Sequence, residues 1–325
     1  MCSAARKLFP KTFYALCVTL KVVLVFGAMS AVSFSAFAAS NTWAQGAPMP
    51  YPVTAASAVT FGGNIYVIGG RDGSAPVAYT QIYNPATNSW SLGTPMPSAA
   101  ETSAGAVFGN YIYIFGGFDS SGYEGRVYQY DPTTNTWAEK TSMPTARGVA
   151  AAAVIDGSIY VVGGNTQTAD WVANLERYDP MSDTWTELAP MNSGRSNLSA
   201  AAFGHTLIVS AGYSATGGMN GSTEIYDTTT NVWSIKASSK GLDGACSAVV
   251  LGRFYLFGGG LLGGAGVRTS QIYDPTTNKW GGRLSMPKVN AQAAGAVYNG
   301  LVYCFGGADS LPSTATYNTV EIYTP

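Results

Sequence analysis

Residues 130–137 read YDPTTNTW, and near-copies of this phrase recur throughout the chain after residue 40. Its tryptophan returns at intervals of 47 or 48 residues. The equivalent positions are Trp43, Trp90, Trp137, Trp185, Trp233 and Trp280. A fixed period of a few tens of residues indicates a repeat protein, in which each unit buries its apolar face by stacking on its neighbours.

Each repeat contains four segments that are typical of β-strands. Residues 103–109 read SAGAVFG, and such small side chains predict the strand closest to a crowded axis. Residues 111–117 read YIYIFGG, where alternating aromatic and aliphatic residues predict a buried strand. Tyr130 lies in the third strand, and the turn DPTTN leads to an outermost strand that Trp137 opens.

These features together resemble the kelch repeat, whose marks are a glycine pair, a Tyr near DPxTNxW, and Met-Pro six residues after the Trp. The glycine pair recurs in every repeat, with Ala211-Gly212 as the one variant. The Tyr-to-Trp spacing and the Met-Pro pair argue against WD-type repeats. The resemblance covers nearly all of residues 41–325 and implies one four-stranded antiparallel blade per repeat. The expected fold is therefore all-β, a six-bladed kelch-type β-propeller.

The repeats are out of step at the two ends of the chain. The repeat region begins at Asn41-Thr42-Trp43, while the chain stops at EIYTP and leaves Tyr323 without its own tryptophan. We predict that the N-terminal strand supplies the outer strand of the sixth blade. That pairing closes the ring and removes an open sheet edge.

The first 38 residues differ in kind from the rest. Basic residues precede an uncharged apolar run over residues 22–37, which ends in Ala36-Phe37-Ala38. This pattern predicts a secretory signal peptide, cleaved near Ala38 or Ala39, and a propeller domain over residues 39–325. The apolar run is short for a membrane span, so we expect no stable membrane insertion, with an uncleaved anchor as the alternative. The predicted location is secreted or periplasmic.

Charge and cysteine content narrow the partners and the chemistry. Loss of the first 38 residues would leave 13 Lys and Arg against 18 Asp and Glu, with the basic residues dispersed. Nucleic acid is therefore not an expected partner. Cys246 and Cys304 would remain, and we expect two packed thiols, because disulfide geometry is strict and a fold of this size needs no staple.

The chain contains a single histidine, His205, in a predicted turn. This scarcity excludes a multi-histidine zinc or copper site, including that of the copper radical oxidases that carry kelch-like propellers, and disfavours a Ser-His-Asp triad. No Walker loop, GxSxG elbow, HExxH or EF-hand motif is evident. We therefore expect no metal, no cofactor and no enzymatic activity.

Candidate binding residues are those that break the repeat on the face where loops converge. Arg147, Arg195 and Asn290 precede inner strands near the mouth of the ring. The loops between second and third strands carry Asp119, Tyr123, Asp170, Trp171, Tyr213 and Asp309. Trp171 is the one tryptophan of the repeat region outside the repeat register. It is typical of the anchor of a binding surface or a sugar-stacking platform, although it could also simply cover its own loop.

The favoured function is an exported, monomeric, non-enzymatic binding module that recognises a protein or an extracellular glycan. The alternative is an enzyme resembling the periplasmic kelch sialic-acid mutarotases. In that case Glu101 and Asp243 would act as acid and base, and Arg147 and Arg195 would bind a carboxylate. The regular repeats and the lack of long insertions argue against the alternative.

Overall fold

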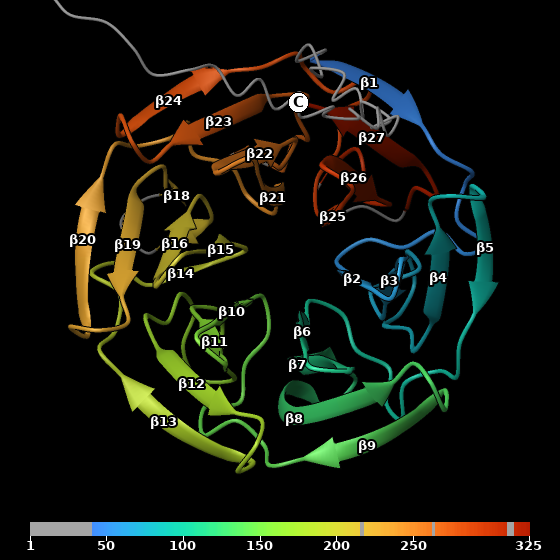
Figure 1. Ribbon diagram of the computed structural model, residues 1–325, viewed down its shortest axis with the longest axis horizontal. Coiled ribbons are helices and arrows are strands. Elements are labelled where there is room, and N and C mark those ends of the chain that lie inside the picture. Colours follow the sequence, from blue (N-terminus) through green and yellow to red (C-terminus); the bar gives the residue numbers. More distant parts are fainter. Residues whose placement is uncertain (1–40, 215–217, 262–263, 311–314) are drawn as a thin grey trace, which may run out of the picture. The chain divides into compact units, whose positions relative to one another are not determined.

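The structure is a computed structural model and describes residues 41–214, 218–261, 264–310 and 315–325. The predicted signal peptide and its cleavage point lie outside these residues and stay predictions. Within the described ranges the chain forms six four-stranded antiparallel sheets and one small three-stranded sheet (Figure 1). The all-β, six-bladed kelch-type propeller expected from the sequence is confirmed.

Each four-stranded sheet is one blade, whose strands follow one another from the axis outward (Figure 1). Blade 1 contains β2 (Ser57–Phe61), β3 (Asn64–Ile68), β4 (Thr80–Asn84) and β5 (Ser89–Leu92). Blade 2 contains β6 (Ala104–Phe108), β7 (Tyr111–Asp119), β8 (Gly122–Asp131) and β9 (Thr136–Lys140). Blade 3 contains β10 (Ala151–Ile155), β11 (Ser158–Val162), β12 (Leu175–Asp179) and β13 (Thr184–Leu188).

The remaining blades follow the same order. Blade 4 contains β15 (Ser199–Phe203), β16 (Thr206–Ser210), β19 (Thr223–Asp227) and β20 (Val232–Lys236), and the small sheet beside it contains β14 (Arg195–Ser196), β17 (Tyr213–Ser214) and β18 (Gly218–Met219). Blade 5 contains β21 (Cys246–Val250), β22 (Arg253–Phe257), β23 (Ser270–Asp274) and β24 (Lys279–Gly282). Blade 6 contains β25 (Ala294–Tyr298), β26 (Leu301–Phe305), β27 (Val320–Thr324) and β1 (Thr42–Gln45).

The two ends of the chain meet in blade 6. Strand β1 pairs antiparallel with β27, and Trp43 lies opposite Tyr323 in the register. The Tyr323 hydroxyl donates to Asn41 Oδ1 at 2.7 Å. The first described residues thus supply the tryptophan and asparagine that the last repeat lacks.

The phrase DPTTNTW forms a clamp between neighbouring blades. In blade 2 the Asn135 Oδ1 atom accepts from the Tyr130 hydroxyl at 2.5 Å and from the backbone N–H of Thr94 at 2.7 Å. Trp137 Nε1 donates to the Thr94 carbonyl oxygen at 2.8 Å. Thr94, in the segment that leaves blade 1, is therefore bound through both its N–H and its C=O by residues of blade 2. The same three bonds recur at Asn41, Asn88, Asp183, Asn231 and Asn278.

The glycine pair exists because another segment passes directly over it. Gly116 has a φ of +54°, and a Cβ there would collide with the carbonyl oxygen of Arg147 and the Met143 methyl group. In blades 1, 2, 5 and 6 a methionine atom lies within 3.1 Å of the corresponding Cβ position. The Met of the Met-Pro motif thus covers the first glycine.

Blade 4 differs from the other blades both at the first glycine of the pair and at the methionine that covers it. Ala211 replaces the first glycine, is fully buried and keeps a φ of +64°. Ser239 stands where the other repeats have Met, and its hydroxyl bonds to Ser210 Oγ at 3.2 Å and to the Gly221 carbonyl at 3.1 Å. The smaller Ser239 leaves room for the extra methyl group of Ala211.

The expectation of two packed thiols is wrong, because Cys246 and Cys304 form a disulfide. Cys246 lies on β21 of blade 5 and Cys304 on β26 of blade 6, with their Cα atoms 5.9 Å apart. That separation is within the range that disulfide geometry requires. The repeat alignment places the two cysteines in adjacent blades, and the bond links those two blades.

Candidate functional site

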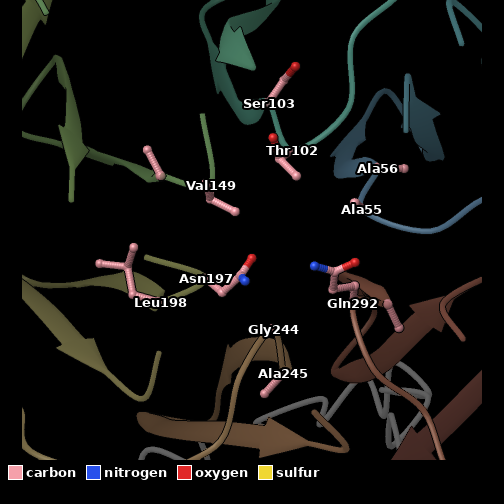
Figure 2. A pocket seen from close by; sticks show the side chains of 12 residues that line it. Ala55, Ala56, Thr102, Ser103, Val149, Asn197, Leu198, Gly244, Ala245 and Gln292 are labelled. Atoms are coloured by element: carbon pink, nitrogen blue, oxygen red, sulfur yellow. The ribbon is translucent and has the colours of Figure 1, made fainter. Parts of the chain in front are cut away.

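Six equivalent residues, one entering each blade, surround the propeller axis (Figure 2). We call them the axial ring: Ala55, Thr102, Val149, Asn197, Gly244 and Gln292. Each backbone N–H donates to the carbonyl oxygen of the preceding member at 2.8–3.1 Å, and Ala55 donates to Gln292. The six bonds close a complete circle, which ties every blade to the next at the axis.

The axial ring has an unusual backbone conformation. All six members have φ between +51° and +59°, including the β-branched residues Thr102 and Val149. Left-handed conformations are costly for β-branched residues and persist only where surrounding contacts enforce them. Here the enforcing contacts are the two ring bonds that each residue makes.

A cavity of about 110 Å³ lies within the ring and is lined by ring members and their successors. Its ring side chains alternate around the axis. Thr102, Asn197 and Gln292, which lead into blades 2, 4 and 6, carry hydrogen-bonding groups, whereas Ala55, Val149 and Gly244 do not. The opening therefore combines three polar groups with three small or apolar ones.

Arg147 and Arg195 do not face this opening, contrary to the prediction that they bind a ligand. Both are fully buried. Arg147 pairs with Glu176 at 2.7 Å and Arg195 with Glu224 at 2.5 Å, and burial lowers the pKa of each guanidinium. Each arginine joins the segment entering a blade to the third strand of that blade, so its role is structural.

Asn290 and Asp119, two further predicted ligand-binding residues, are also buried. Asn290 is 3% exposed, and its Nδ2 donates to the Gly306 carbonyl at 2.9 Å. Asp119 is 7% exposed, caps its own turn through the backbone N–H of Ser121 at 2.6 Å, and pairs with Arg126 at 3.4 Å. These contacts stabilise the loops.

Glu101 and Asp243 occupy equivalent positions, although the repeat alignment places them one residue apart. Each forms the isolated bridge just before the axial ring, Glu101 with Phe118 and Asp243 with Gly260. The segment entering blade 5 is one residue shorter than the others, which moves Leu242 into the Arg147 position and Asp243 into the Glu101 position. Since they lead into blades 2 and 5, the two carboxyls lie on opposite sides of the axis.

The two carboxyls also differ in surroundings. Glu101 Oε1 pairs with Arg71 at 3.0 Å, while burial raises its pKa. Burial raises the pKa of Asp243 to about 6, and Asn197 donates to it. The Oδ1 atom of Asp243 is enclosed and has no hydrogen-bond partner among the described residues.

Aromatic side chains of blades 2, 3 and 4 gather where the chain passes from the second to the third strand of each blade. We call Phe118, Tyr123, Trp171 and Tyr213 the aromatic patch. The rings of Phe118 and Tyr123 lie 5.1 Å apart, and those of Trp171 and Tyr213 lie 5.6 Å apart. Phe118 is 36% exposed and the other three are half-buried.

Asn165 joins the two halves of the aromatic patch. Its Nδ2 donates to the Tyr123 hydroxyl at 3.4 Å, and its Oδ1 accepts from the backbone N–H of Trp171 at 2.9 Å. Trp171 has a φ of +56°, so this bond helps to hold a strained backbone. The geometry thus brings together Tyr123, Trp171 and Tyr213 of the predicted site residues.

The other predicted residues lie around this patch or away from it. Asp170 is exposed beside Trp171. Asp309 is exposed on a blade 6 loop, where its carbonyl accepts from Gly266 of blade 5. Sequence reasoning missed Phe118 and Asn165, although both directly follow a glycine pair, as Arg71 does in blade 1.

No group of three or more His, Cys, Asp or Glu side chains in the described ranges is placed to hold a metal ion. Among the same residues no helix has the length and apolar character to cross a membrane.

Comparison with known families agrees with this architecture. The family model described as the Attractin/LZTR1 beta-propeller matches residues 29–216, which is more than half of the chain. The chain therefore belongs to this family of kelch-type β-propellers. No curated protein matches it. Membership suggests a protein-interaction module.

Proposed function

We propose that this protein is an exported, non-catalytic binding module that takes a protein partner on the aromatic patch. The observation that carries the proposal is the convergence of Phe118, Tyr123, Trp171 and Tyr213 from three blades. Tyrosine and tryptophan are enriched among residues that dominate binding energy, because their rings bury a large area at a low entropy cost. Membership in a propeller family of interaction modules supports the same conclusion.

The aromatic patch is ordered before a partner arrives. Asn165 positions the hydroxyl of Tyr123 and the backbone of Trp171 together. The backbone N–H of Tyr123 also donates to Gln167 at 3.4 Å, which links the blade 2 hairpin to the blade 3 loop. Such preorganisation reduces the entropy that binding would otherwise lose.

Export is supported by two independent features. The predicted signal peptide is one, and the disulfide between Cys246 and Cys304 is the other, because disulfides persist mainly in oxidising compartments. A mutarotase has less support, since Arg147 and Arg195 are buried and the Glu101 and Asp243 carboxyls lie on opposite sides of the axis.

Site-specific photo-crosslinking in the native host tests the proposal. A photoreactive phenylalanine analogue replaces Tyr213 in one variant and Ile235 in a matched control, because Ile235 is 67% exposed on outer strand β20, away from the patch. We expect a discrete protein adduct from position 213 and none from position 235. The adduct should disappear when Trp171→Ala is added.

Two results would contradict this function. One is the same adducts from both positions, which indicates non-specific contact. The other is binding to a glycan array that Trp171→Ala abolishes, without any protein adduct, which would replace the protein partner with a glycan.

A further inference from the structure

In the axial ring every backbone N–H group is engaged in a hydrogen bond, whereas the backbone carbonyl oxygens can accept further bonds. Each of its six backbone N–H groups donates within the ring. Each of the six carbonyl oxygens accepts one of these bonds, and the Gln292 carbonyl also accepts from the Thr54 hydroxyl at 3.4 Å. The other five keep a second lone pair that no bond among the described residues uses. The ring backbone is therefore suited to a positively charged or hydrogen-donating occupant, and an anion would find no free backbone N–H there.

The polar side chains of the ring add further oxygen atoms. Figure 2 shows the amide groups of Asn197 and Gln292 pointing toward each other across the opening. Thr102 lines the same opening, and its hydroxyl donates to the Glu101 carbonyl at 2.6 Å, so the oxygen remains free to accept. In Figure 2 the nitrogen of the Gln292 amide faces Asn197, and a flip of this amide turns its oxygen toward the space between them.

The residue before one ring member carries a carboxyl that has no counter-charge among the described residues. None of the residues that line the cavity in the described chain is charged. Asp243 directly precedes the ring member Gly244 and receives a hydrogen bond from the Asn197 side chain. Its Oδ1 atom is enclosed and has no hydrogen-bond partner in the part of the chain that the structure describes. Its counterpart Glu101, at the equivalent place on the opposite side, has Arg71 as its counter-charge. An enclosed carboxylate is costly unless a cation compensates it.

We propose that the axial opening binds a small inorganic cation, held by the side-chain oxygens of Asn197 and Gln292 with Asp243 as its counter-charge. Carbonyl and carboxylate oxygens are the ligands that hard cations prefer. A single carboxylate in the set favours a singly charged ion over calcium. The cavity volume of about 110 Å³ admits such an ion together with one or two waters.

Cation titrations of the protein lacking residues 1–38 test this site. The probes are potassium, sodium and calcium chloride, with choline chloride at equal ionic strength as the reference. We expect a saturable rise of a few degrees in the unfolding midpoint with at least one inorganic cation, as binding to the folded state alone produces.

Isothermal titration calorimetry on two matched variants separates the site from general salt effects. Asp243→Asn should weaken cation binding at least tenfold, whereas Glu101→Gln, at the equivalent position, should leave it unchanged. Calorimetry reports binding directly, so a change in the stability of either variant does not obscure the result. Equal midpoints in all four salts without measurable heats, or cation binding that survives Asp243→Asn, would overturn the proposal.

Discussion

Replacing Arg147 with leucine should lower the free energy of unfolding by about 3 to 5 kcal/mol. The change leaves the Glu176 carboxylate fully buried without its counter-ion. It also removes bonds from Arg147 to the carbonyls of Thr145 and Val161, both at 3.1 Å. Most of this loss comes from leaving the Glu176 carboxylate buried without a partner, because an unpaired buried charge costs more free energy than the intact ion pair contributes.

The repeats themselves supply the compensating change. In blade 5 the positions of Arg147 and Glu176 are occupied by Leu242 and Gln271, and the Gln271 amide bonds to the backbone of Lys240. The double variant Arg147→Leu with Glu176→Gln copies that arrangement. It should recover to within about 1 to 2 kcal/mol of the parent, because no buried charge remains.

Urea unfolding of the parent, both single variants and the double variant gives a coupling energy, expected to be at least about 2 kcal/mol. A single Arg147→Leu variant within about 0.5 kcal/mol of the parent would refute the structural role. A double variant no more stable than the single one would refute the reasoning about charge.

Three further predictions concern the ring closure, blade 4 and the axial carboxyl. Removing residues 40–48 from a chain that begins at residue 39 should lower the melting temperature by about 5 °C or more, because blade 6 loses its outer strand; an unchanged value in calorimetry contradicts closure by β1. Ser239→Met should lower the free energy of unfolding by about 1 to 3 kcal/mol, because the longer side chain crowds Ala211. Adding Ala211→Gly should restore most of this loss, and equal stabilities of the single and double variants would disprove the compensation. Because the pKa of Asp243 is raised from 3.8 to about 6, the folded state binds this proton more tightly than the unfolded state. Stability in choline chloride should therefore be full below about pH 4 and fall by up to about 3 kcal/mol as pH rises through 6; Asp243→Asn should flatten that slope, and a slope that persists points to another group.

The aromatic patch shows how far sequence reasoning reaches into a site. Trp171 stands out because it breaks the tryptophan period, and Tyr213 because it lies on a predicted loop between the second and third strands. Their contact at 5.6 Å, and the joint role of Asn165, depend on two loops from neighbouring blades that no local pattern relates. The same limit explains the misaligned Asp243, because a one-residue deletion near Lys240 is visible only through the backbone bonds that restore the register.

The repeat pattern alone specified the blade number, the strand order and the meeting of Trp43 with Tyr323. These features come from hydrogen bonds between residues at fixed spacing, such as the clamp of Tyr130, Asn135 and Trp137, so copies of the phrase imply copies of the structure. Tertiary structure decided which way the exceptional side chains point. An arginine entering a blade turns inward because a glutamate 29 residues later, on the third strand of that blade, pairs with it, and only the packing of the two segments reveals that contact.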